Sequence, residues 1–307
     1  MSFEGSEKKF EIIINPQSES LRKYSFYPSL LKKAKTKVVN QFSNSHCDAY
    51  ILSESSLFVW EHRLTLITCG KTTLSSAVLY LVKHLDKEAI QALFFQRKNE
   101  LFPLGQKTSF EYDVIQLRKK FEGKALRFGH LDEHHFFLFH LEQSYLPHPK
   151  DHTIEILMYD IQGELNSLFK SSAPAEQIRS ALNLESSFPG FTLQDHAFQP
   201  QGYSLNALRG EEYYTIHVTP QEPGYYVSFE TNMENPSEVL NKVIRLFRPL
   251  RLDVITFFPF SYGEDFQCEL DGFVKNVFSK KRLNCGFDVQ FSAFSNIKSQ
   301  ASSPYTW

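Results

Sequence analysis

Three consecutive polar residues, Glu54, Ser55 and Ser56, interrupt an otherwise largely apolar stretch between residues 50 and 74. Serine side chains readily hydrogen-bond to nearby backbone, so the triplet predicts a kink in a strand or a tight turn. In a strained Glu-Ser peptide the serine hydroxyl can attack the preceding carbonyl, and β-elimination from the resulting ester leaves a chain that begins with a pyruvoyl group. Such a keto carbonyl forms a Schiff base with a substrate amine and acts as an electron sink for decarboxylation. On its own, however, a Ser-Glu-Ser-Ser sequence is most often a solvated turn.

The elements around the triplet are predicted from the pattern of apolar residues. Runs rich in β-branched and aromatic residues at 49–52 and 57–60, and then at 63–68, flank Glu61 and His62, which indicates a hairpin. Thr72 and Thr73 can cap a helix whose apolar residues follow at helical spacing. We expect this helix to cover the sheet.

Three more motifs accompany this stretch: Phe3-Glu4-Gly5-Ser6-Glu7-Lys8, Tyr214-Thr215-Ile216-His217 and Ser228-Phe229-Glu230-Thr231-Asn232. With residues 50–70, and in the same order over nearly the whole chain, they resemble S-adenosylmethionine decarboxylase of the eukaryotic type. The resemblance implies self-cleavage between Glu54 and Ser55 into a β chain, 1–54, and an α chain, 55–307. It also implies a pyruvoyl cofactor derived from Ser55, with neither pyridoxal phosphate nor a metal, and decarboxylation of S-adenosylmethionine (AdoMet) for spermidine synthesis.

The resemblance assigns catalytic roles to four residues. Ser55 is the pyruvoyl precursor and Schiff-base former, and Ser204 assists ester formation. His217 takes the α-proton during elimination, a task suited to a side chain that titrates near neutral pH. Cys69 returns a proton to the substrate α-carbon after carbon dioxide leaves. Taken singly, His217 would be a satisfied core histidine and Cys69 a small buried hydrophobe.

The same resemblance implies a substrate site. Phe3 and Phe198 match aromatics that sandwich the adenine and hold the sulfonium over ring faces, and Leu52 belongs to the same site. Glu4 matches a carboxylate close to the pyruvoyl and the substrate, and Glu7 matches a carboxylate that activity requires. The ribose contact departs from the family, because Gln221 stands where a glutamate accepts two hydroxyl hydrogen bonds. Glutamine still accepts one bond and donates another, and Glu222 is the alternative candidate.

An acidic cluster matches the site that binds putrescine between the sheets of the animal enzymes. Its members here are Glu11, Asp151, Thr153, Glu155 and Glu230. Carboxylates gathered in a core cannot all stay ionised without a cation. The family's lysine in this cluster aligns with Ile67, and an aromatic that lines the diamine pocket aligns with Lys280. We therefore expect Lys280 to reach inward and replace the diamine, unless it belongs to a solvated basic turn.

Composition indicates an ordinary globular chain with small-molecule partners. Of 307 residues 42% are hydrophobic, enough for a large core, and the net charge of −2 is spread without blocks. This gives no reason to expect nucleic acid or a membrane as partner. Four cysteines without paired spacing indicate free thiols, and an acidic start unlike a signal peptide completes the expectation of a cytoplasmic protein. A homodimer of processed protomers is possible.

The chain divides into two similar halves, about 1–148 and 149–307, at the break Pro147-His148-Pro149. Each half mixes strands with about two helices, so the pattern alone predicts only an α+β fold with two sheets face to face. The resemblance sharpens this to an internally duplicated four-layer αββα sandwich in one domain. Residues 125–141 alternate like a single strand, which would place His130, Asp132 and His134 on one face. A metal site there is disfavoured, because such faces are usually solvated.

Two other functions compete with AdoMet decarboxylation. The change at Gln221 would suit a pyruvoyl decarboxylase of another amino acid, such as ornithine or arginine, although Phe3 and Phe198 argue against it. An inactive paralogue that regulates a partner predicts loss of the cleavage serine, whereas Ser55, Cys69, Ser204 and His217 are all present.

Overall fold

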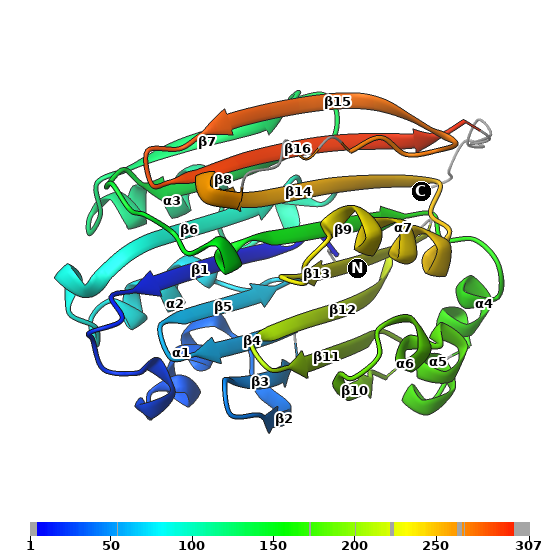
Figure 1. Ribbon diagram of the computed structural model, residues 1–307, viewed down its shortest axis with the longest axis horizontal. Coiled ribbons are helices and arrows are strands. Elements are labelled where there is room, and N and C mark those ends of the chain that lie inside the picture. Colours follow the sequence, from blue (N-terminus) through cyan, green and yellow to red (C-terminus); the bar gives the residue numbers. More distant parts are fainter. Residues whose placement is uncertain are drawn as a thin grey trace.

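The computed structural model describes residues 5–53, 55–171, 173–199, 201–221, 224–262, 266 and 268–297. Within these residues, sixteen strands form two antiparallel sheets of eight (Figure 1). The first sheet has the order β2-β3-β4-β5-β1-β6-β8-β7, and the second β10-β11-β12-β13-β9-β14-β16-β15. Adding eight to each number of the first order gives the second, so both halves of the chain have one topology.

The first sheet comprises β1 (Lys8–Ile14), β2 (Val38–Ser43), β3 (Cys47–Leu52), β4 (Ser55–Trp60), β5 (Arg63–Thr68), β6 (Ile90–Lys98), β7 (Gly123–Gly129) and β8 (His135–Leu141). The second comprises β9 (Thr153–Tyr159), β10 (Thr192–Ala197), β11 (Tyr203–Arg209), β12 (Glu212–Gln221), β13 (Gly224–Thr231), β14 (Arg251–Pro259), β15 (Phe273–Arg282) and β16 (Phe287–Asn296). In Figure 1 both sheets run from β7 and β15 at the top to β2 and β10 at the bottom.

Helices cover the outer face of each sheet. The first sheet carries α1 (Tyr27–Ala34), α2 (Leu74–Leu81) and α3 (Phe110–Arg118). The second carries α4 (Glu164–Lys170), α5 (Ala175–Leu182), α6 (Leu184–Ser187) and α7 (Pro236–Phe247). Short 3-10 helices are η1 (Leu21–Lys23), η2 (Lys87–Ala89), η3 (Pro103–Gly105), η4 (Pro149–Asp151) and η5 (Phe260–Tyr262). The predicted α+β fold of two sheets with outer helices is confirmed.

Strand β1 shows how the sequence assigns side chains to layers. Phe10 and Ile12 pack in the core beneath α1, α2 and α3, whereas Ile13 packs between the sheets. Because side chains alternate along a strand, Lys9 and Glu11 also face the second sheet. The layer between the sheets thus has apolar clusters, around Phe291 near one end and around Phe58 near the other, and polar side chains between them.

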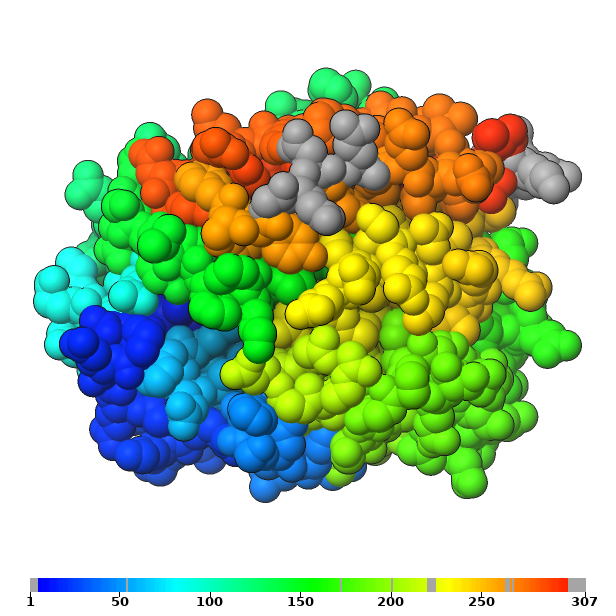
Figure 2. All heavy atoms as spheres, in the orientation of Figure 1, coloured from blue at the N-terminus to red at the C-terminus, as the bar shows by residue number. Residues whose placement is uncertain are grey.

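The two halves pack closely. Drawn as spheres, the blue and cyan atoms of the first half meet the green to orange atoms of the second along a continuous boundary on the face in view (Figure 2). Strand β3 lies against β11, β2 against β10, and β7 against β15 and β16. The two sheets therefore contact each other at both edges, with the polar layer between them.

Some elements differ from the sequence-based expectation. Residues 125–141 form the two strands β7 and β8, and His130 and Asp132 lie in the turn between them. His134 contacts Asp253 instead, with Nδ1 2.9 Å from a carboxylate oxygen. The single face predicted for these three residues was therefore wrong, because a turn breaks the alternation. No group of three possible metal ligands occurs in the described part of the chain.

Lys280, expected to reach inward unless it belonged to a solvated basic turn, lies near the end of an edge strand, β15. Lys280 is exposed there and does not lie between the sheets. Among the described residues, no helix is long and apolar enough to cross a membrane.

Candidate active site

Ser55 begins β4 directly after the turn from β3. Leu52 and Ser55 are paired across the two strands, so Ser55 and Ser56 begin a second strand and do not form a kink within one strand. Ser55 is 3% exposed and has a φ of 141°. A positive φ strains any residue with a Cβ atom, and such strain persists only where the surrounding structure enforces it. Here the pairing of β4 with β3 and β5 holds the serine in place.

The hydroxyl of Ser55 meets a histidine from the opposite sheet. Ser55 Oγ lies 3.1 Å from His217 Nδ1 and 3.2 Å from His217 Nε2. His217 sits in the middle of β12, 3% exposed, and is paired with Ser204 of β11 and Ser228 of β13. The structure therefore brings together Ser55, Ser204 and His217, which are far apart in the sequence.

One side of the His217 ring faces a carboxylate. Glu7 Oε1 lies 3.0 Å from Nδ1, and Ser228 Oγ donates a 2.5 Å hydrogen bond to the same oxygen. Glu7 precedes β1 in the first sheet, whereas Ser228 belongs to the second. The carboxylate therefore orients the histidine and can balance a positive charge on it.

The other side of the ring faces hydroxyl groups. His217 Nε2 lies 2.9 Å from Ser56 Oγ and 3.0 Å from Thr215 Oγ1. Both hydroxyls donate to Asn206 Oδ1, over 2.7 Å and 2.9 Å. Asn206 is fully buried and His217 is 3% exposed, so this network restrains the ring in a buried position.

Sequence reasoning did not single out Ser56, Thr215 or Ser228 as contacts of the histidine. It also did not single out Asn206 as the group that accepts from Ser56 and Thr215. Alternation along strands could have found two of them, because Thr215 is two residues before His217 and Asn206 two residues after Ser204. Ser228 belongs to the motif Ser228-Phe229-Glu230-Thr231-Asn232. The missing information was the register between β11, β12 and β13.

The backbone of Cys69 lies close to that of Ser55 in the first sheet. Thr68 is the residue of β5 that pairs with Ser55, and Cys69 follows it directly. The thiol residue is 8% exposed, and Gly70 beyond it has a φ of 63°. Lys8 Nζ donates to the Gly70 carbonyl over 2.9 Å.

The residues expected to hold the substrate are only partly described. Phe3, Glu4, Glu54 and Glu222 lie outside the described residues, as does the side chain of Gln221 at the end of β12. Leu52 is fully buried in the core beneath the helices of the first sheet, although its backbone pairs with Ser55. Phe198 is half-buried just after the edge strand β10.

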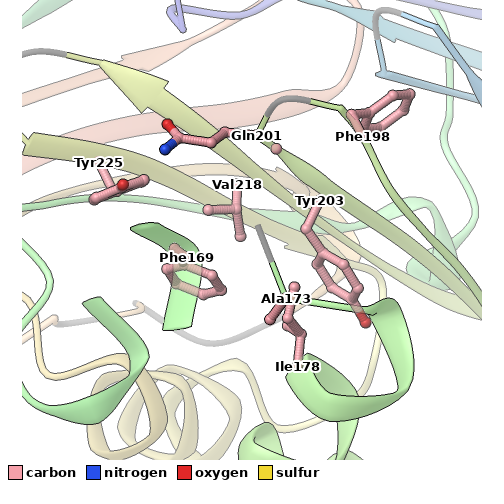
Figure 3. A pocket seen from close by; sticks show the side chains of 9 residues that line it. Phe169, Ala173, Ile178, Phe198, Gln201, Tyr203, Val218 and Tyr225 are labelled. Atoms are coloured by element: carbon pink, nitrogen blue, oxygen red, sulfur yellow. The ribbon is translucent and has the colours of Figure 1, made fainter. Parts of the chain in front are cut away.

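A small cavity of about 10 Å³ lies on the outer side of the second sheet. Figure 3 shows the side chains that line it. Tyr203 and Val218 line it together with Phe169 and Ile178 of the helix layer. Phe198 also lines it, with its ring directed away from these side chains. Tyr203 and Val218 adjoin Ser204 and His217 in sequence, so they face the opposite side of the sheet. This cavity is therefore separate from the serine–histidine site.

The acidic cluster between the sheets has its own cations. Lys9 Nζ lies 2.9 Å from a carboxylate oxygen of Glu155 and 2.9 Å from one of Glu230. Burial disfavours the charge on Lys9, but the two carboxylates outweigh burial and raise its pKa. Burial raises the pKa of Glu230 to about 7 in spite of Lys9. Arg63 Nη2 donates to Glu11 Oε2 over 2.8 Å.

The expectation that Lys280 neutralises this cluster does not fit these positions. Lys280 is exposed on β15, whereas Lys9 pairs across β1 and β5 with Ile67, where the family has a lysine. The cation thus comes from the neighbouring strand. Asp151 accepts from the Tyr145 hydroxyl over 3.2 Å, and burial raises its pKa. Thr153 begins β9 and is buried.

The family profile described as adenosylmethionine decarboxylase matches residues 1–297. This chain belongs to the adenosylmethionine decarboxylase family. It is 35% identical over 279 residues to the S-adenosylmethionine decarboxylase proenzyme of Leishmania donovani, covering 83% of this chain and 73% of the relative. The proenzyme of Xenopus laevis is 29% identical over 98% of this chain and 97% of its own length. These findings confirm that the chain is a decarboxylase of this family.

A solved structure supports the fold assignment. The crystal structure of the Trypanosoma brucei AdoMetDC-delta26 monomer matches with a TM-score of 0.61 and 27% identity, over 78% of this chain and 98% of that one. The match confirms the four-layer sandwich that the resemblance implied.

Proposed function

We propose that this chain is made as a proenzyme that cleaves itself between Glu54 and Ser55 and then decarboxylates AdoMet with the resulting pyruvoyl group. The observation that carries the proposal is the contact between Ser55 Oγ and the His217 ring at 3.1 Å, at a serine whose φ is 141°. Membership of the family supports the substrate. Decarboxylated AdoMet is the aminopropyl donor that spermidine synthesis requires.

The chemistry of processing follows from these positions. Ser55 Oγ bonds to the carbonyl carbon of residue 54 while the peptide C–N bond breaks, which turns the amide into an ester with a free amine at Ser55. Relief of the strained φ favours this step. His217 then takes the α-proton of residue 55, the Cβ–O bond breaks, and residue 54 leaves as a carboxylate. Hydrolysis of the remaining enamine releases ammonia and leaves the pyruvoyl group.

The surrounding residues hold the base ready for that proton. Glu7 on one side of His217, and Ser56 and Thr215 on the other, restrain the ring, and Glu7 can balance the imidazolium charge. Ser204, paired with His217, is the hydroxyl proposed to assist ester formation. The pyruvoyl group supplies an electrophilic carbonyl and an electron sink. Cys69, beside the partner of Ser55, is the proposed proton donor to the substrate α-carbon.

We also propose that the enzyme works without putrescine. A diamine would neutralise the acidic cluster, but Lys9 already bridges Glu155 and Glu230, and Arg63 pairs with Glu11. Lys9 therefore takes the role that the sequence predicted for Lys280. The ammonium is held within the chain, so no ordering of a separate ligand is needed.

Further proposals concern organisation and setting. The common strand order supports an ancestral duplication of two halves, about 1–148 and 149–307, within one domain. Four buried cysteines that form no disulfide support a reducing compartment such as the cytosol. We expect a homodimer of processed protomers, which sedimentation would test.

Mass spectrometry of the purified protein tests the function. The wild type should give two chains, 1–54 and a pyruvoyl-capped 55–307, and Ser55→Ala should give a single intact chain. Carbon dioxide release is then measured with AdoMet, ornithine and arginine in parallel, and AdoMet should be preferred. An intact wild-type chain without pyruvoyl would contradict the proposal, and preference for ornithine or arginine would favour a changed substrate.

A further inference from the structure

Lys8 is a buried lysine that the chemistry described so far does not use. It neighbours Lys9 on β1 and so faces the helix layer, and it is 1% exposed. Its Nζ donates to the carbonyl of Gly70 over 2.9 Å and to Gln106 Oε1 over 2.5 Å. Gly70, at a φ of 63°, follows Cys69 directly. The lysine thus ties down the turn that carries the thiol.

The carboxylates near Lys8 form ion pairs with Arg97. Arg97 pairs with Lys8 across β1 and β6, and it binds Asp113 over 2.6 Å and Glu100 over 2.8 Å. In the described part of the chain, Lys8 makes no ion pair with these carboxylates or any other. Burial, and then Arg97, lower the pKa of Lys8 to about 8, while Glu100, Asp113 and Cys69 act in the opposite direction.

A positive charge held on the turn that carries a thiol has a use in the proposed reaction. When Cys69 passes its proton from Sγ to the carbon that carbon dioxide has left, a thiolate remains in a buried site. A thiolate is favoured by a nearby cation and disfavoured by burial. If the proton goes to the cofactor carbon instead, water would release the substrate as an aldehyde. The substrate nitrogen would stay on the chain as an N-terminal alanine, and the enzyme would be lost. The position of the thiol and the cost of its negative charge therefore decide between turnover and inactivation.

We propose that Lys8 is a positioning residue for this proton transfer: its Nζ fixes the Cys69–Gly70 turn through the Gly70 carbonyl and places a positive charge where the thiolate forms. The proposal rests on the proposed function, because it gives Lys8 a role in the same proton transfer. Lys8 touches neither substrate nor cofactor in this role and acts through Cys69 alone.

Three variants separate the parts of this role. Lys8→Met removes both the charge and the hydrogen bond, Lys8→Gln removes the charge but keeps an N–H donor, and Lys8→Arg keeps the charge. Gln106→Leu is the matched control, because it removes the other partner of Nζ and leaves the lysine and its bond to Gly70. Each is purified, and its processing, kcat, KM and the fraction of α chain ending in alanine after turnover are measured.

We expect Lys8→Met and Lys8→Gln to process and to keep a near-normal KM. Their kcat should fall on the order of tenfold to a hundredfold, part of what a general acid contributes, and the alanine-capped fraction per turnover should rise. Lys8→Arg should recover part of both losses, and Gln106→Leu should resemble the wild type. A loss of kcat with an unchanged alanine fraction would overturn the proposal, because it would mean general structural damage.

A second measurement does not depend on turnover. In the unprocessed Ser55→Ala protein, the rate of alkylation of Cys69 by iodoacetamide at neutral pH is followed by peptide mass spectrometry, with and without Lys8→Gln. We expect the rate to fall several-fold without the charge, because less thiolate is present. An unchanged rate would refute the role of Lys8. If the wild type fails to process or decarboxylate, the proposed function fails, and this second measurement still decides whether Lys8 controls the thiol.

Discussion

The two sheets have the same strand order, yet the turns between equivalent strands differ. In the second sheet, the β11–β12 turn places Gly210 at a φ of 59°, with open space where a Cβ atom would be. In the first sheet, the β3–β4 turn leads into Ser55 at a φ of 141°. Glycine adopts a positive φ at little cost, whereas serine is strained there. One half thus has a relaxed turn, and the other stores strain at the bond proposed to break.

The equivalent strands β1 and β9 also differ, in the charged side chains that they place between the sheets. Strand β1 contributes Lys9 and Glu11 to the layer between the sheets, whereas its counterpart β9 contributes Glu155 and no cation. The charges of one half are therefore completed by the other. Two copies of one fold have become complementary, so neither half can supply the site by itself.

The largest effect is expected from Lys9→Met, which removes the cation of the first half. It leaves Glu155 and Glu230 buried together, and breaking a buried ion pair in this way costs about 3–5 kcal/mol of unfolding free energy. Processing should then slow in the variant and recover with millimolar putrescine. Chemical denaturation and the rate of appearance of two chains measure both effects.

The pH dependence of Lys9→Met follows from the sign of the Glu230 shift. The pKa of Glu230 is already raised to about 7, above its unfolded value, so its burial favours the fold at low pH and loses that benefit as pH rises toward 7. Without Lys9 the pKa rises further, and the deficit in stability should be larger at pH 8 than at pH 6. Lys280→Met, on the exposed edge strand, is the control and should change neither the stability nor the rate of processing. A putrescine requirement in that variant would restore the hypothesis that Lys280 neutralises the acidic cluster.

Ser55→Gly and Ser55→Ala measure the strain in the first turn directly. Neither can process, so both are single chains that differ only in the Cβ atom at a φ of 141°. The glycine variant should be more stable by about 1 kcal/mol or more, because strain at such a position exceeds the entropic cost of glycine. Equal stability, or a more stable alanine variant, would show that the turn holds no strain.

Gly210→Ala is the converse change in the second turn. The added Cβ meets no neighbouring atom within 4 Å, so only the positive φ opposes it, at a cost of about 1 kcal/mol. Thermal unfolding should register this loss while processing proceeds at the wild-type rate. Slower processing would contradict the comparison, because it would mean that the β11–β12 turn affects cleavage at the β3–β4 turn.

The sequence predicted the fold and the reacting pair better than the electrostatics around them. Ser55 and His217 lie in long motifs, and the strands near them alternate clearly. Lys9 was overlooked because Lys8 and Lys9 are adjacent in a strand buried on both faces, where composition cannot tell which side chain faces which layer. Only the strand register shows that Lys9 lies beside Ile67. Ile67 aligns with a lysine of the family, so Lys9 can supply the positive charge that Ile67 lacks.

The turn at residues 130–134 was missed for a related reason. His130 and Asp132 continue the alternation of the strands on either side, and Gly129, at a φ of 89°, was the available sign of a break. The side chain of Asn206 meets that of Thr215 only through the pairing of β11 with β12. Such pairing depends on contacts between residues distant in the sequence, which a local pattern does not contain.

The position of β1 has a consequence for the lifetime of the protein. β1 is hydrogen-bonded between β5 and β6, so a cut after residue 54 would leave the short fragment threaded through the middle of the first sheet. Refolding after denaturation would then require two molecules to meet, at a rate that depends on concentration. The serine would already have been consumed, so new cofactor could come only from new synthesis. Such an enzyme matures once and is replaced, not repaired.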